Sequence, residues 1–204
     1  QYDFVICQAV LRHLDNPASY IRKMISFAKP GGYVVCMDVN RAFESCGLYV
    51  DGMDYHSLCR HEGLEKKWQT ELAMQGRDYS AAIKAAHIMQ RLVLEGVDVR
   101  MNDKVEFITP QHAEYPAARE DFLQSNHWDS PVSREEEDGI VMQLMSHGLS
   151  RKEAQDHCLR NREIAEYFSA NPGAGFTFVR GMLISYGRKP AAQPDNGTPR
   201  DSGR

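Results

Sequence analysis

Apolar residues near the start of the chain alternate between short continuous runs and helical spacing. The run at residues 3–7 is typical of a strand buried on both faces of a parallel sheet. Asn16-Pro17 predicts a helix start, because Asn can cap free amides and Pro suits the first helical position, and apolar residues recur at helical spacing to about residue 28. Lys29-Pro30-Gly31-Gly32 predicts a stop. With the apolar run at 33–38, this stretch predicts a strand–helix–strand crossover.

The middle of the chain has a weaker pattern. Glycines interrupt residues 42–76, which we predict to be short helices and loops. An apolar stripe followed by Gly96 predicts a helix over about 80–95. Alternating apolar residues over 97–108 predict a strand, and Asn102-Asp103 within it suggests a bulge or an edge.

Residues 111–171 are predicted to be a helical insertion between the last two strands. Two capping boxes indicate helix starts there, one formed by Ser133 and Glu136 and the other by Ser150 and Glu153. The expected helices cover about 134–147 and 151–170. The apolar residues from Phe176 to Tyr186 predict one long strand, bent near Gly181, which ends the domain at 172–189. The tail over 190–204 lacks large apolar residues and is predicted to be disordered.

Composition narrows the class of protein. The 204 residues are 42% apolar and carry a net charge of -4, which suits one globular domain. Basic runs do not exceed two residues, so a nucleic-acid or membrane-surface partner is not expected, and a small-molecule ligand fits better. No stretch of about eighteen apolar residues occurs. The five cysteines include no Cys-x-x-Cys pair, which favours reduced thiols and a cytoplasmic location.

Two segments of the chain, DFVICQAVLRHLDNP and FAKPGGYVVCMDVNR, resemble the fourth and fifth strands of class I S-adenosylmethionine-dependent methyltransferases. Residues 76–105 resemble the following helix and sixth strand of a bacterial small-molecule subgroup, and residues 176–189 resemble its last strand. The resemblance implies an α/β fold with a partial Rossmann-like methyltransferase sheet in the order 4-5-7-6. In that order the Asp3 strand lies beside the Tyr33 strand, the last strand is antiparallel, and the Val97 strand is at the edge.

The first half of that fold is not recognised in the sequence. Members of the family generally hold the cofactor with a glycine-rich turn after the first strand and an acidic residue after the second, and neither is found. We therefore expect residues 1–110 to be the C-terminal half of the sheet, with residues 42–76 forming cap helices, and the chain to be a fragment that is inactive alone. The Asp3 strand would then lack a neighbour, so the missing N-terminal half or self-association is expected at its edge.

Candidate site residues follow the two parallel strands, because ligands of open α/β sheets bind beyond the carboxyl ends of the strands. The resemblance implies that Gln8, Ala9 and Val10 pass the methionine part of S-adenosylmethionine, although a simple connector is an alternative. His13 is the candidate general base for a methyl acceptor, with a packing role as the alternative.

Asp38, Asn40 and Arg41 are candidates for orienting a small-molecule acceptor, or else form a helix cap and an ion pair. No metal is assigned, because His56, Cys59 and His61 supply only three of the four ligands of a structural zinc site. The aromatic residues of the middle region fit either an acceptor pocket or a core: Tyr55, Trp68, Tyr79, Tyr115, Phe122 and Trp128.

Two function classes follow. The first is a fragment of a methyltransferase that acts on a small molecule. The second is a non-catalytic, methyltransferase-like binding or assembly protein. Methyl transfer from a sulfonium needs positioning and removal of a proton more than a compact catalytic motif, so sequence patterns alone leave both open.

Overall fold

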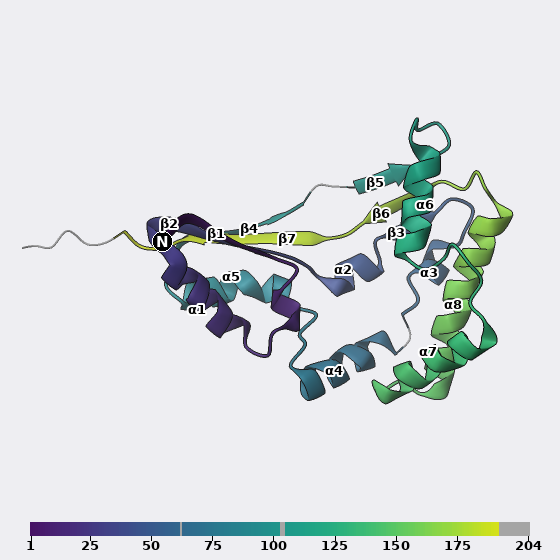
Figure 1. The fold of residues 1–204 in the computed structure, drawn as a ribbon, viewed down its shortest axis with the longest axis horizontal. Helices are drawn as coiled ribbons and strands as arrows, with labels where there is room; N and C mark the ends of the chain where they lie inside the picture. Colours follow the sequence, from purple (N-terminus) through teal and green to yellow (C-terminus); the bar gives the residue numbers. More distant parts are fainter. Residues whose placement is uncertain (62, 103–104, 192–204) are drawn as a thin grey trace, which may run out of the picture.

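A computed structural model describes residues 1–61, 63–102 and 105–191 of the chain. The predicted tail lies largely outside these residues. The secondary-structure elements run along the chain in an α/β arrangement (Figure 1). They are β1 (Tyr2–Gln8), the 3-10 helix η1 (Leu11–His13), α1 (Pro17–Phe27), β2 (Ala28–Val39), α2 (Arg41–Ser45), β3 (Leu48–Val50), α3 (Tyr55–Leu58), α4 (Leu64–Gln75), α5 (Ala81–Arg91), β4 (Glu95–Met101), β5 (Val105–Ile108), α6 (Tyr115–Ser125), α7 (Arg134–Ser146), α8 (Arg151–Ala170), β6 (Phe176–Val179) and β7 (Met182–Arg188).

The main sheet has four strands in the order β1-β2-β7-β4. β1 and β2 are parallel, with Cys7 opposite Cys36, and β7 is antiparallel to both β2 and β4. The connection from β1 to β2 runs through α1, whose first turn is capped by Asn16, since the side chain of Asn16 accepts a hydrogen bond from Ser19 N at 3.0 Å. The predicted strand–helix–strand crossover is therefore present.

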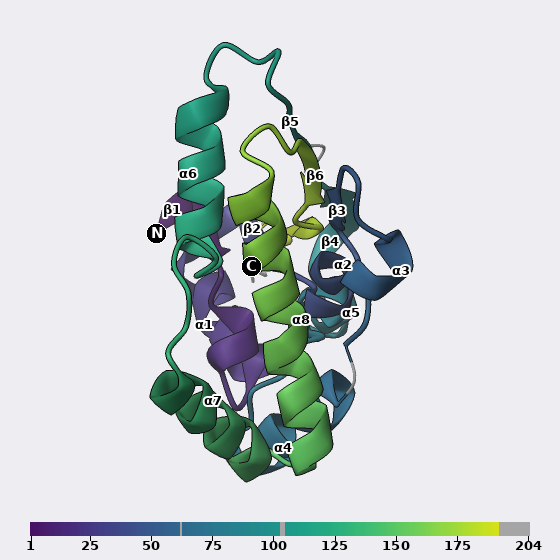
Figure 2. The same ribbon diagram turned by 90° about the vertical axis from the view of Figure 1, so that its right-hand side faces the viewer.

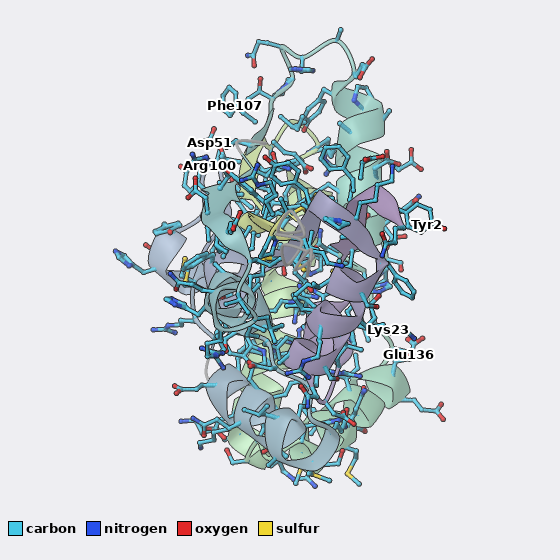
Figure 3. All side chains as sticks on the ribbon, turned by 90° about the vertical axis from the view of Figure 1, so that its left-hand side faces the viewer. Tyr2, Lys23, Asp51, Arg100, Phe107 and Glu136 are labelled. Carbon is cyan, nitrogen blue, oxygen red and sulfur yellow. The ribbon has the colours of Figure 1, made fainter. Side chains whose placement is uncertain are left out.

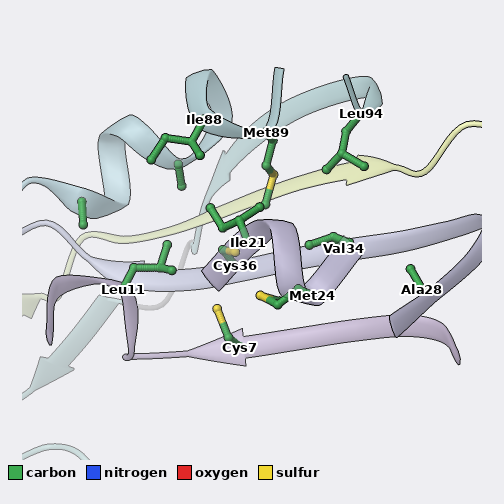
Figure 4. Packing of buried hydrophobic residues seen from close by; sticks show 12 residues of the cluster. Cys7, Leu11, Ile21, Met24, Ala28, Val34, Cys36, Ile88, Met89 and Leu94 are labelled. Atoms are coloured by element: carbon green, nitrogen blue, oxygen red, sulfur yellow. The ribbon is translucent and has the colours of Figure 1, made fainter. Parts of the chain in front are cut away.

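Helices α1 and α5 cover one face of this sheet (Figures 1 and 4). Ile21 and Met24 of α1 and Met89 of α5 pack against the inward side chains of β1 and β2, including Val34 and Cys36. Ile21, Val34 and Met89 have no exposed surface. Burial of these apolar side chains is the main stabilising contribution in this part of the fold.

The opposite face of β1 is exposed. Tyr2, Phe4 and Ile6 are 65%, 62% and 56% exposed, and Figure 3 shows Tyr2 at the outer edge of the molecule. Phe4 stacks on Tyr33 of β2, with ring centroids 5.6 Å apart, but this contact leaves both rings accessible. Alternating strand residues thus divide into a packed set under the helices and an apolar set open to solvent.

A second sheet, with the order β3-β6-β5, differs from the sequence expectation. The segment expected to form one strand over residues 176–186 is divided into β6 and β7, which belong to different sheets. The division falls at Gly181, which has φ +62° and packs against Phe43. The segment over 97–108 is likewise divided, because β4 pairs with β7 whereas β5 pairs with β6.

The second sheet has its own core. Phe122 of α6 stacks on Phe176 of β6 with ring centroids 4.0 Å apart, and Phe168 of α8 meets both rings edge to face. Figure 2 shows α8 running beside α6, with α7 near one end of α8. Long-range aromatic packing, which periodicity along the chain does not report, therefore builds this part of the molecule.

The helices of the 111–171 region begin where the capping signals place them. Both capping boxes are formed: Ser133 and Ser150 accept hydrogen bonds from the backbone of the third residue of α7 and α8, and each receives the reciprocal carboxylate. Three helices, α6, α7 and α8, occupy the region. Among the described residues, no helix has the combination of length and apolar character that crossing a membrane requires.

Candidate functional site

The parallel strands β1 and β2 end beside a cavity of about 580 Å³. Val39 at the end of β2, and Arg12 and Arg41 just after the two strands, form one wall. The other walls include side chains from α4, α6 and α8. The site is therefore made where the main sheet meets the helices inserted between its later strands, at the end of the sheet where open α/β folds bind ligands.

Gln8, Ala9 and Val10 turn the chain away from β1. Gln8 and Ala9 are exposed and Val10 is partly buried. Ala9 has φ 54°, which is uncommon for a residue with a side chain, and its N–H donates a 2.8 Å hydrogen bond to the carbonyl of Met37. This bond ties the turn to β2, so the exposed backbone after β1 has a fixed position. These three residues do not line the cavity itself.

Asp38 is buried, with 1% of its surface exposed, and is fully engaged. Its Oδ1 accepts a hydrogen bond from Val39 N at 2.9 Å, and its Oδ2 accepts a weaker one from Arg12 N at 3.4 Å. The guanidinium of Arg12 lies 3.9 Å from Oδ1. Asp38 therefore joins the end of β2 to the turn after β1 and holds Arg12 at the cavity.

His13 is exposed, and its Nε2 accepts a hydrogen bond from Arg12 Nε at 3.1 Å. Partial desolvation, followed by the charges of Arg12, Arg77 and Arg41, lowers the pKa of His13. Asp38 acts in the opposite direction. The imidazole is thus kept neutral near pH 7, with its basic nitrogen directed to Arg12. His13 does not line the cavity.

Asn40 and Arg41 begin helix α2. The side chain of Asn40 accepts a hydrogen bond from Ala42 N at 3.0 Å, which makes Asn40 the N-cap. Arg41 forms an ion pair with Glu44. Of the alternatives left open by the sequence, the helix cap and the ion pair are both present. Arg41 and Glu44 line the cavity, whereas Asn40 does not.

Aromatic side chains form the wall opposite the strands. Trp68 of α4 lies against Tyr79, with ring centroids 5.8 Å apart, and Trp128 meets Phe122 edge to face at 5.7 Å. These four rings line the cavity. The other two aromatic candidates do not: Tyr55 is exposed, and Tyr115 is buried with its hydroxyl donating to Pro172 O and Ala174 O.

Tyr79 and Lys67 are held in place by Glu71, a carboxylate with only 2% of its surface exposed. The hydroxyl of Tyr79 donates to Glu71 Oε2 at 2.6 Å, and Arg77 donates to the same oxygen at 3.3 Å. Lys67 lies 3.8 Å from Oε1. Burial, followed by the hydrogen bond to Glu71, raises the pKa of Tyr79. The phenol therefore stays protonated and acts as a donor.

Arg160 of α8 spans the gap to the loop after α3. Its NH1 donates to the carbonyls of Leu58 and Arg60, at 3.2 and 2.6 Å, and lies 2.8 Å from His61 Nδ1. The Nε2 of His61 is bonded to Ser45 O. Both ring nitrogens of His61 are thus occupied. Among the described residues, no cluster of His, Cys, Asp and Glu suited to a metal ion is found.

Sequence reasoning missed the cationic side chains that meet at the cavity. Arg12 lies between the cofactor candidates and His13 in the sequence. Arg160 looks like an ordinary exposed residue of a predicted helix, and Arg180 lies in the segment that was expected to be one strand. Arg12 lies more than 100 residues before Arg160 and Arg180 along the chain, so no local signal could have identified their shared position.

Comparison with known proteins gives a consistent picture. A family model described as a methyltransferase domain matches residues 1–93. The chain is 33% identical over 123 residues to the ubiquinone biosynthesis O-methyltransferase of Aeromonas salmonicida (strain A449), a match that covers 55% of this chain and 51% of that protein. The protein of the same name from Bordetella pertussis is 40% identical over 55 residues, which cover 27% of this chain and 23% of that protein.

The chain therefore spans about half the length of the Aeromonas protein. Among solved structures, a putative methyltransferase from Bacillus halodurans C-125 is similar at 12% identity and a TM-score of 0.35, with 93% of this chain and 70% of that chain covered. A TM-score of this size does not establish a shared arrangement of the elements.

Proposed function

Because residues 1–93 match a methyltransferase domain, we propose that this chain belongs to the class I S-adenosylmethionine-dependent methyltransferases and forms the acceptor-binding half of an enzyme that methylates a small molecule. The observation that carries the proposal is the cavity of about 580 Å³ at the carboxyl ends of the parallel strands β1 and β2. We further propose that the order β1-β2-β7-β4 corresponds to strands 4-5-7-6 of the family sheet. A small-molecule acceptor, rather than nucleic acid or a membrane, suits a cavity of this volume.

The residues after β1 fit one part of S-adenosylmethionine. Gln8 and Ala9 are exposed, and the hydrogen bond from Ala9 N to Met37 O holds this turn against β2. We assign Gln8, Ala9 and Val10 to the methionine part of the cofactor. When bound, the cofactor supplies an activated methyl group, and the protein has to position the acceptor and remove its proton.

His13 is our candidate for the general base. Its lowered pKa keeps the imidazole neutral near pH 7, and Arg12 must release Nε2 before that nitrogen can accept a proton from an acceptor. Asp38 acts on the acceptor through Arg12, and Asn40 through the start of α2, whereas Arg41 contacts the cavity directly. Asp38 and Asn40 are therefore positioning residues.

The exposed apolar surface of β1 supports an assembly role as part of this proposal. β1 is the outer strand of the described sheet, and Tyr2, Phe4 and Ile6 make one of its faces apolar and exposed. An unpaired strand edge binds another strand readily. We propose that the N-terminal half of a methyltransferase pairs with this edge and completes the cofactor site, and that the chain alone self-associates and is inactive. A purely non-catalytic assembly protein is the alternative. The absence of disulfides among the five cysteines supports a cytoplasmic setting.

Calorimetric titration with S-adenosylmethionine tests the proposal on this chain and on a longer protein that also carries a glycine-rich strand–turn–helix. We expect saturable heat from the longer protein and none from this chain. Gln8→Ala should weaken binding in the longer protein, and Gln69→Ala on α4 is the control because Gln69 bonds only Glu65 in the described structure. No heat from the longer protein at high micromolar cofactor would refute the enzyme proposal and favour the assembly alternative.

Kinetics of the longer protein then test His13. We expect His13→Gln to lower kcat about a hundredfold, with KM less affected, and to remove the acidic limb of the pH profile. If the variant keeps the pH profile of the native enzyme, His13 is a packing residue and not the base.

A further inference from the structure

The cavity is lined by more positive than negative side chains. Five cationic residues contribute to its walls, and Glu44 is the one carboxylate among the described lining residues. The cations are Arg12, Arg41, Lys67, Arg160 and Arg180. They come from η1, α2, α4, α8 and the β6–β7 connection, so the fold gathers positive charge at this point from five separate parts of the chain.

Four of these five cations have a carboxylate partner in the described structure. Arg41 pairs with Glu44, and Arg180 lies 3.4 Å from Glu106. Asp38 lies 3.9 Å from Arg12, and Glu71 lies 3.8 Å from Lys67, which are long distances for ion pairs, and Glu71 also serves Arg77. Burial and then the charge of Arg12 lower the pKa of Arg41.

Arg160 is the strongest single indication. Its NH1 bonds only to neutral groups, namely two backbone carbonyls and the ring of His61. Its Nε is buried and has no hydrogen-bond partner, and in the described part of the chain the guanidinium forms no ion pair with a carboxylate. A partly buried guanidinium without a counter-charge is costly, and because Arg160 lines the cavity, an anionic ligand there would supply the counter-charge.

The remaining walls are aromatic. Trp68 with Tyr79, and Phe122 with Trp128, line the same cavity. Rings of this kind bind a planar aromatic ligand by stacking or by edge-to-face contact. The cavity thus combines cations that would hold an anionic oxygen group with surfaces that would hold a ring.

We propose that the acceptor is a small aromatic molecule that carries a negatively charged oxygen group, held by Arg160, and by Arg41 in place of Glu44, while its ring lies between the two aromatic pairs. This inference rests on the proposed methyltransferase function, because it names the substrate class of the same site. Arg160 is the residue that separates charged from neutral acceptors.

Intrinsic fluorescence measures ligand binding in the cavity, because the two tryptophans of the chain, Trp68 and Trp128, both line it. The probes are benzoate, phenyl phosphate and the neutral benzamide. We expect saturable changes with benzoate or phenyl phosphate at concentrations about tenfold lower than with benzamide. The tighter of the two anions distinguishes a carboxylate from a phosphate.

Arg160→Gln should remove this preference, and Arg162→Gln is the matched control on α8. Arg162 pairs with Glu137 at 3.0 Å and lines a neighbouring cavity. Circular dichroism checks folding, and if Arg160→Gln does not fold, Arg41→Gln serves as the second variant, since 41% of the Arg41 side chain is exposed.

Equal binding of benzoate, phenyl phosphate and benzamide, or no saturable change with any probe, would overturn the inference. So would the same loss of preference in Arg162→Gln. The calorimetric titration with S-adenosylmethionine tests the proposed methyltransferase function independently of the substrate class. Cofactor binding without a preference for anions defeats only the substrate class, whereas a preference for anions without cofactor binding in the longer protein defeats only the methyltransferase function.

Discussion

His157 should make the stability of the protein fall as the pH is lowered. It lies on α8, is partly buried, and carries an imidazole close to three basic groups. Burial first, and then the charges of Arg160, Lys67 and His61, lower the pKa of His157 to about 4 from an ordinary 6.5. The folded protein therefore resists a proton that the unfolded chain accepts.

The size of the effect follows from the two pKa values. The difference of about 2.5 corresponds to about 3 kcal/mol at most, because each pH unit is worth about 1.4 kcal/mol and partial exposure screens the charges. The contribution is fully present above pH 6.5 and is lost as the pH falls toward 4. We expect a loss of about 1.4 kcal/mol at about pH 5.5 and about 2.5 kcal/mol at about pH 4.5.

Urea unfolding of the native protein and of His157→Gln measures this loss, with exposed His56→Gln as the control for removing an imidazole. The free energies of unfolding are compared at about pH 7.5, 5.5 and 4.5, so that other titrating groups cancel in the difference between proteins. Native protein should lose stability relative to His157→Gln as the pH falls. Parallel pH dependences for these two proteins would refute the reasoning.

Three further outcomes are expected. Phe122→Ala should lower the free energy of unfolding in urea by about 3–5 kcal/mol, and Phe122→Leu by less, because the ring is the centre of the second core; a loss below about 1 kcal/mol would contradict this. Ser150→Ala should cost about 1 kcal/mol by removing a capping box, whereas Ser146→Ala on the exposed end of α7 should not; equal thermal shifts would argue against the cap. Ile6→Lys should raise the monomer fraction in analytical ultracentrifugation and Ile83→Lys on α5 should not; unchanged association in the first variant would exclude the β1 edge.

Helix starts and strands that depend on neighbouring residues were predicted correctly from the sequence. The cap at Asn16, both capping boxes and the apolar runs at 3–7 and 33–38 specify helices and strands through neighbouring residues, and the structure has them. The same reasoning was wrong for residues 176–186, because the apolar pattern is continuous there while the pairing partner changes at Gly181. The strand β3 was not expected, because only its pairing with β6 makes three residues a strand.

The candidate site was less accessible to sequence. Residues after β1 and β2 could be named because parallel strands place their carboxyl ends together, and Arg41 of that group lines the cavity. The sequence could not show that Asp38 and Asn40 are hydrogen-bonded to backbone N–H groups. A carboxylate or amide at a strand end can bind a ligand or a backbone amide equally well.

By itself the sequence determined the helix starts, the parallel pair of strands and the match of residues 1–93 to a methyltransferase domain, because each depends on residues close together or on a contiguous match. Tertiary structure alone decided which cations share a cavity. Arg12 and Arg160 are far apart along the chain, and they line one site because the aromatic core around Phe122 packs α6 and α8 on the second sheet, next to the ends of the parallel strands. Charged residues that are far apart in the sequence leave no periodic pattern, so tertiary packing, and not local propensity, sets the charge of the cavity.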